Sequence, residues 1–99
     1  MSQKDELTAE TRIWRRPGLS VRQVGEDVFV LDLNRHRFHR IAGAGIRIWE
    51  LLAEPTTLGE LVARLQEEFD ADPERVRADC ETFVARLLGE DLLRTGAAE

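Results

Sequence analysis

Histidine, cysteine and serine are the residues of this chain that could carry nucleophilic or metal chemistry. The chain has one cysteine and two histidines, His36 and His39, and its two serines lie far from any organised base. Imidazoles three residues apart on a strand point to opposite faces, so they are not a natural chelate for zinc, which takes four ligands. The two histidines therefore predict no metal site.

Cys80, the one cysteine, offers little as a catalytic thiol. It lies in the middle of a predicted helix between Asp79 and Glu81, and neighbouring negative charge opposes formation of the reactive thiolate. A lone cysteine on an apolar stripe is typical of a small buried side chain. The motifs of P-loop, dinucleotide-binding, serine hydrolase, zinc protease and CxxC sites do not occur in the sequence. We therefore expect a chain that is not an enzyme and uses no cofactor.

Charge is distributed unevenly along this acidic chain. The net charge is −5, which argues against a general binder of polyanions. Residues 34 to 49 nevertheless hold four arginines and two histidines and no acid, whereas residues 50 to 99 hold 13 acids and 5 arginines. The basic strip over residues 34 to 49 is consistent with a local acidic partner, such as a peptide, or with a solvated strand edge.

Length and composition predict one small folded domain. Of the 99 residues, 42% are hydrophobic and 33% are charged, a balance typical of globular domains. No apolar run approaches the roughly 20 residues that cross a bilayer. Residues 1 to 6 carry charges of both signs and lack the apolar core of a signal peptide. We expect the protein in the cytoplasm.

Three antiparallel strands are predicted between residues 19 and 41. A turn over residues 25 to 27 ends the first strand, and a β-branched, apolar run over residues 28 to 33 forms the second. Asn34 begins a tight turn and suits a positive φ, and residues 37 to 41 form the third strand. Strands joined this closely form antiparallel hairpins.

Three apolar stripes with helical spacing follow the strands. The first ends before Pro55, since proline disfavours helix in the residue that precedes it. Thr57 and Glu60 have the spacing of a capping box and start the second helix. The third helix begins at Pro73 and ends near Gly89, which is expected to act as its C-terminal cap.

This order of elements predicts an α+β fold. A three-stranded antiparallel sheet cannot bury its apolar face alone, so the three helices that follow are expected to pack against it in a winged-helix-like arrangement. The domain is placed over residues 19 to 94. An N-terminal tail or loosely docked arm over residues 1 to 18 precedes it, and a frayed end over residues 95 to 99 follows.

Two binding functions suit such a fold. A winged helix would bind DNA through its third helix, but residues 72 to 90 contain five acids and three arginines, which works against phosphate contacts. The edge of the third strand could instead accept an extended peptide as a further strand, with a groove between it and the third helix. The pattern leaves open which residues of that helix face the core and which face the groove.

The ordered motifs of residues 19 to 94 resemble the PqqD-like family. The chain has Leu-Asp-Leu at 31 to 33, Arg-Phe-His-Arg-Ile at 37 to 41 and Gly-Ile-Arg-Ile-Trp-Glu-Leu-Leu at 45 to 52. The common family pattern is an LDLxxGxY/FxxL/IN hairpin followed by GxxIWxLL. The likeness continues through Thr-Leu-Gly-Glu-Leu at 57 to 61.

Two positions depart from this pattern. His36 stands at the usual turn glycine, and Ala42 stands at the usual asparagine. We therefore expect a hairpin that bends differently and a first helix without a side-chain cap.

The resemblance implies a RiPP recognition element, a winged-helix-like, non-catalytic domain that binds the leader segment of a ribosomally made precursor peptide. In the family, the leader adds as a strand beside the third strand and lies against the third helix. On the matching positions of this chain, the implied peptide-binding residues are Arg37, Phe38, His39, Arg40, Ile41, Val76, Asp79, Cys80 and Phe83. Arg37 or Arg40 is expected to pair with an acid of the leader.

The hairpin and the Ile-Trp pair look most like the stand-alone recognition elements of lasso-peptide clusters. The partner implied there is a leader-cleaving cysteine peptidase. Members that serve pyrroloquinoline quinone synthesis usually show a Pro-Glu hairpin and a Cys-Asp-Gly turn after the first helix, where this chain has Leu-Leu-Ala-Glu-Pro at 51 to 55. A radical-SAM enzyme of pyrroloquinoline quinone or other RiPP biosynthesis is the alternative partner. Neither a nucleic acid nor a membrane is expected as a partner.

Overall fold

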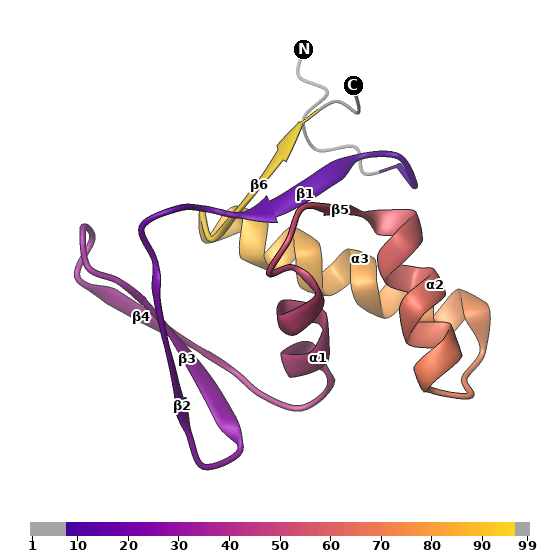
Figure 1. Cartoon of the computed structure of the whole chain (residues 1–99), viewed down its shortest axis with the longest axis horizontal. Coiled ribbons are helices and arrows are strands. Elements are labelled where there is room, and N and C mark those ends of the chain that lie inside the picture. The colour runs from indigo at the N-terminus through magenta and orange to yellow at the C-terminus, as the bar shows by residue number, and fades with distance from the viewer. Residues whose placement is uncertain (1–7, 97–99) are drawn as a thin grey trace.

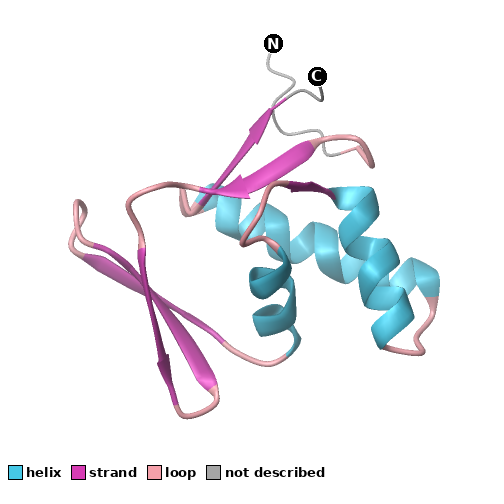
Figure 2. Ribbon diagram, viewed as in Figure 1, coloured by secondary structure: helices cyan, strands magenta, loops and turns pink. Residues whose placement is uncertain are grey.

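The computed structural model describes residues 8 to 96, which form two antiparallel sheets and three helices (Figures 1 and 2). One sheet has the order β5-β1-β6 and consists of β1 (Arg12–Arg15), β5 (Thr56–Thr57) and β6 (Leu93–Gly96). The other has the order β2-β3-β4 and consists of β2 (Ser20–Val24), β3 (Asp27–Asp32) and β4 (Arg37–Ile41). The helices are α1 (Ala44–Leu51), α2 (Leu58–Glu68) and α3 (Pro73–Gly89). The predicted α+β class, with its hairpin strands before three helices, is confirmed.

The β5-β1-β6 sheet is the main difference from the sequence-based picture. Strand β1 lies inside the segment interpreted as a tail or loosely docked arm, yet Ile13 is fully buried and β1 forms the centre of its sheet. Its partners are distant in sequence, because Ile13 is paired with Thr56 on β5 and with Thr95 on β6. A strand of four residues with one fully buried side chain is too short to show the alternation of apolar and polar residues by which strands are predicted from sequence.

The apolar core lies between the helices and the inner faces of both sheets. Figure 2 shows the β2-β3-β4 sheet on one side of α1 and the second sheet across one end of the helices. Trp49 is 1% exposed, and the guanidinium carbon of Arg15 lies 4.2 Å from its ring centroid. Arg15 Nη2 also donates a 2.6 Å hydrogen bond to the Trp49 carbonyl, so β1 is fixed to α1 by both contacts.

The helix starts follow the expected chemistry in part. Thr57 Oγ1 accepts a 3.1 Å hydrogen bond from the Glu60 backbone N–H, as the capping box predicts. The Glu60 carboxylate does not complete the box, because it accepts from the Thr56 hydroxyl at 2.8 Å. Helix α1 starts after Gly43 without a side-chain cap, as Ala42 led us to expect.

Two turn predictions were wrong about which residue adopts a positive φ. In the β3–β4 turn it is His36, with φ of 56°, and not Asn34. After α3 it is Asp91, with φ of 62°, and not Gly89, which is still helical. Histidine at the position of the usual family glycine therefore keeps the left-handed backbone that glycine would adopt more easily.

A buried ion pair joins the two sheets. Arg16, which follows β1, is 8% exposed, and Asp32, the last residue of β3, is 1% exposed. Arg16 Nη2 donates to Asp32 Oδ2, and Arg16 Nε donates to the Asp91 carbonyl at 2.7 Å. One guanidinium thus links the end of β1, the end of β3 and the turn between α3 and β6.

No helix within residues 8 to 96 is long and apolar enough to cross a membrane.

We expect Asp32→Ala to lower the free energy of unfolding by about 3–5 kcal/mol, because the change leaves the Arg16 charge buried with only the more distant Asp91 carboxylate, 3.6 Å from its Nε. Urea denaturation followed by circular dichroism measures this change. Asp27→Ala is the matched control, since it removes the exposed Arg40–Asp27 pair and should cost less than about 1 kcal/mol. Similar losses for the two variants would contradict the special role of the buried pair.

Candidate functional site

Strand β4 has a free edge that can pair with another strand. The sheet order places β3 on one side of β4 and no strand of the described chain on the other. The Arg40 carbonyl accepts a 3.3 Å hydrogen bond from Arg86 Nη2 of α3, so it points away from β3. Because backbone groups alternate in an antiparallel ladder, the groups of Phe38 point the same way. The edge therefore presents the backbone N–H and C=O groups of Phe38 and Arg40.

The C-terminal end of α3 reaches β4 through two long side chains. At its C-terminal end, Glu90 Oε1 lies 3.3 Å from His39 Nδ1. One turn earlier, Arg86 reaches the Arg40 carbonyl. Phe83 packs so tightly on α1 that a Cβ added to Gly45 would lie 2.5 Å from its ring. Glycine at position 45 is therefore required for the close approach of α3 to α1 beyond the end of β4.

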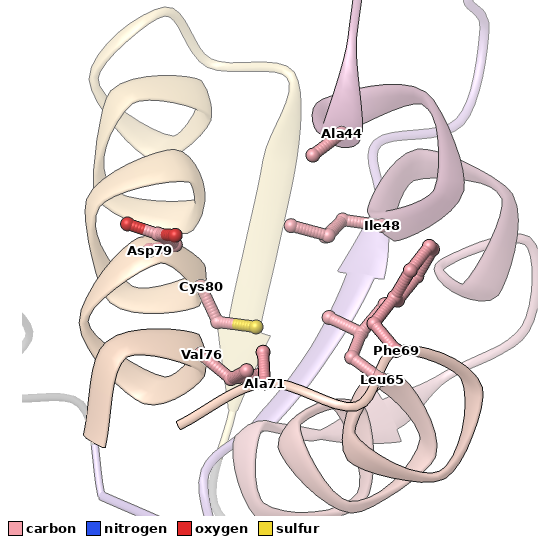
Figure 3. A pocket seen from close by; sticks show the side chains of 8 residues that line it. All are labelled: Ala44, Ile48, Leu65, Phe69, Ala71, Val76, Asp79 and Cys80. Atoms are coloured by element: carbon pink, nitrogen blue, oxygen red, sulfur yellow. The ribbon is translucent and has the colours of Figure 1, made fainter. Parts of the chain in front are cut away.

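A mostly apolar cavity of about 170 Å³ lies farther toward the N-terminal end of α3 (Figure 3). It is formed by α1, the end of α2, the segment after α2 and the first half of α3. Its lining residues are Ala44, Ile48, Leu65, Phe69, Ala71, Val76, Asp79 and Cys80. Asp79 contributes the only charged side chain of this lining. We call the β4 edge, the facing residues of α3 and this cavity the β4–α3 site.

An ion pair between α1 and α2 supports the cavity wall. Arg47 Nε and Nη2 donate to the two carboxylate oxygens of Glu68 at 2.8 Å and 2.6 Å. These hydrogen bonds raise the pKa of Arg47, with a further contribution from Glu50, and the Arg47 hydrogen bond lowers the pKa of Glu68. A bidentate pair of this geometry restricts the angle between the two helices that hold Ile48 and Leu65.

The structure distributes the predicted peptide-binding residues over three environments. Val76, Asp79 and Cys80 line the cavity, and Phe83 lies between the cavity and β4. The predicted strand residues form β4, where Phe38 is 68% exposed and its ring lies 6.1 Å from that of Phe29, centroid to centroid. Ile41 is fully buried, and because backbone groups alternate along β4, its N–H and C=O point toward β3 and not toward the free edge.

Sequence reasoning missed five of the eight residues that line the cavity. Leu65 and Phe69 belong to the apolar stripe of the second helix, and Ile48 belongs to the Ile-Trp motif, but these signals did not assign them to a ligand site. Ala44 and Ala71 were not predicted to belong to the site either. Arg86 was also missed, although it is the residue that reaches the free edge of β4. A helix stripe indicates burial but cannot show that the helices diverge and leave a space between them.

The basic strip over residues 34 to 49 carries less unpaired positive charge than its sequence indicates, because acids outside the strip form ion pairs with most of its arginines. The ion pairs are Arg35 with Asp91, Arg40 with Asp27, and Arg47 with Glu68 and Glu50. Arg37 is the arginine of the strip that pairs with no acid among residues 8 to 96. Attraction of an acidic ligand to β4 would therefore depend first on Arg37.

A free strand edge, a facing helix and an apolar cavity define a small ligand-binding domain of the α+β class. The family model of coenzyme PQQ synthesis protein D (PqqD) matches residues 27 to 93, which is more than half of the chain. The chain therefore belongs to the PqqD family, and the resemblance seen in its motifs is confirmed.

Solved structures with this fold include two that contain a leader peptide. TbiB1 in complex with the TbiA(beta) leader peptide is 26% identical, with a TM-score of 0.75, over 87% of this chain and 99% of that chain. Lasso peptide synthetase B1 complexed with the leader peptide is 20% identical, with a TM-score of 0.71 and the same coverage.

A third similar structure is that of a PqqD domain. The PqqD truncation of Methylobacterium extorquens PqqCD, a stand-alone RiPP recognition element, is 17% identical, with a TM-score of 0.76, over 94% of this chain and 99% of that chain. At this identity, as for the synthetase B1 structure, the likeness shows the fold alone. No curated protein matches the chain by sequence.

Cys80 should react slowly with alkylating reagents in the folded protein. Burial, together with the negative charges of Asp79 and Glu81, raises the pKa of its thiol to about 11. Because the thiolate is the reactive form, iodoacetamide at pH 8 should modify the native protein at least about tenfold more slowly than the protein unfolded in urea. Mass spectrometry of timed samples measures both rates. Equal rates would show that the thiol is not buried and that its pKa is not raised.

Proposed function

We propose that this chain binds the leader segment of a ribosomally synthesised precursor peptide, which adds as a strand to β4 and lies against α3. The free β4 edge next to an apolar cavity is the observation that carries this proposal. TbiB1, which is 26% identical over 87% of this chain, was solved with a leader peptide and supports it. The peptide-binding residues named from the sequence remain part of the proposal.

The site offers both kinds of contact that binding of a flexible peptide needs, backbone pairing and a pocket for a buried side chain. A leader loses conformational entropy when it becomes a strand, so backbone pairing must be supplemented by buried anchors. The edge at Phe38 and Arg40 supplies the pairing, and the cavity supplies a place for an apolar leader side chain. Seven residues of α3 separate Arg86 from Asp79, or about 10 Å. The anchor should therefore lie about three leader residues from the one paired with Arg40.

In this proposal the chain performs no chemistry of its own. Its thiol is buried with a raised pKa, and its two histidines lie in the β3–β4 turn and beside Glu90. Bound leader would instead raise the effective concentration of the scissile region near a partner enzyme. We propose a leader-cleaving cysteine peptidase of lasso-peptide maturation as that partner, with a radical-SAM enzyme as the alternative. Ribosomal precursors are made in the cytoplasm, so binding is expected there.

Fluorescence anisotropy with the labelled leader of the nearest precursor gene tests the function. We expect saturable binding that is lost when prolines replace residues of the strand-forming segment, because proline removes the backbone N–H that pairs with β4. A random DNA duplex is included as the competing ligand. Binding to the duplex alone would replace this proposal with a nucleic-acid function, and binding to neither ligand would reject it for this leader.

Arg37→Gln should weaken binding of an acidic leader by about threefold, because Arg37 pairs with no acid among residues 8 to 96 and an exposed charge pair contributes about 0.2–1 kcal/mol. Arg40→Gln should have a smaller effect, since Arg40 Nε already donates to Asp27 at 2.7 Å. The same titrations in low and high salt measure both effects. A larger loss for Arg40 than for Arg37 would show that the Asp27 pair opens when the leader binds.

A further inference from the structure

Arg86 of α3 occupies the part of the β4 edge that an added strand needs. Its Nη2 donates to the Arg40 carbonyl at 3.3 Å across 46 residues of sequence. Its Nε lies 3.8 Å from Glu90 Oε2, and Glu90 Oε1 lies 3.3 Å from His39 Nδ1. Two side chains therefore join the end of α3 to β4. Arg86 contacts the Arg40 carbonyl at the strand edge, and Glu90 contacts His39 on the inner face of the sheet.

A strand that pairs along β4 requires the Arg40 carbonyl as an acceptor for its own backbone N–H. The ladder bond would approach that carbonyl from the direction that Arg86 now takes, so the guanidinium has to move away first. This movement costs little, because the Arg86 side chain is 49% exposed and regains water when it leaves. The guanidinium stays within reach of the added strand, since α3 holds its backbone beside the edge.

We propose that Arg86 is a displaceable cover of the β4 edge that selects leaders with an acidic side chain next to the residue paired with Arg40. This inference rests on the proposed function and names a specificity determinant of the same site. A displaced guanidinium matches a carboxylate in shape and charge, and its five donors can keep Glu90 as a second partner.

The face of the added strand fixes where the acid must stand. His39 and Ile41 of β4 point to the inner face, where His39 meets Glu90 of α3, whereas Arg40 points to the outer face, where it meets Asp27. A leader residue opposite Arg40 also points outward. Its two neighbours point inward toward α3, so one of these two positions places a carboxylate next to Arg86.

The same helix offers a matched control for Arg86. Arg77 forms an equivalent i,i+4 pair with Glu81 at 3.0 Å, and its side chain is 47% exposed. Nine residues, or two and a half turns, separate Arg77 from Arg86, so the two side chains lie on opposite faces of α3. Replacement of either arginine by glutamine removes the same charge from the same helix.

A paired walk of glutamate and glutamine along the strand-forming segment of the leader tests the proposal. Each position is replaced in turn by either residue, and anisotropy gives the ratio of the two affinities for the wild type, Arg86→Gln and Arg77→Gln. We expect one inward-facing position at which glutamate binds the wild type about fivefold more tightly than glutamine. This preference should vanish in Arg86→Gln and persist in Arg77→Gln. Equal melting temperatures of the three proteins confirm that each is folded.

The outcomes separate this inference from the proposed function. If every leader binds but no position prefers glutamate, or if Arg77→Gln abolishes the preference equally, the role of Arg86 is rejected and leader binding stands. If Arg86→Gln loses more than about threefold affinity for a leader without acids, Arg86 is a direct contact rather than a displaceable cover. If no leader binds the wild type, the proposed function fails before the role of Arg86 is reached.

Discussion

The buried pair of Arg16 and Asp32 is the constraint on which the rest of this domain depends. A charge with 1% exposure, as at Asp32, persists in a core only when it is paired, so the end of β1 must meet the end of β3. Asp32 Oδ1 also accepts from the Arg35 backbone N–H at 3.3 Å and so shapes the turn into β4. Arg16 binds the Asp91 carbonyl after α3. The same two side chains therefore position β4 and the end of α3, the two sides of the site.

The opposite end of the β4–α3 site is held by packing and by an exposed ion pair. Phe83 lies against the backbone of α1 at Gly45, which leaves no room for a Cβ and sets the separation of α3 and α1. Arg47 and Glu68 join α1 to α2 beside the cavity. Contacts outside the cavity thus join α1 to both helices that line it, α2 and α3.

Internal pairing of charge changes how the electrostatics of the site should be understood. Most arginines of the basic strip satisfy acids of this chain, so they stabilise turns and helix contacts rather than present a positive surface. An acidic ligand would meet Arg37, which is unpaired among residues 8 to 96, and Arg86, whose contact with a carbonyl is easily exchanged. In the proposed function, selectivity for an acidic ligand would then come from these two positions and not from a general positive field, in keeping with a net charge of −5.

The sequence by itself determined the elements whose signals are local. Helical periodicity, the Thr57 cap and the proline at the start of α3 placed the helices, and a tight turn placed the β3–β4 hairpin. The family motifs assigned the proposed peptide-binding residues to the segments that form β4 and α3. Tertiary structure alone decided the β5-β1-β6 sheet, the pairing of the basic strip, the cavity and the reach of Arg86. Each of these joins segments far apart in the chain, and spacing within a segment carries no information about the partner that a residue meets across the fold.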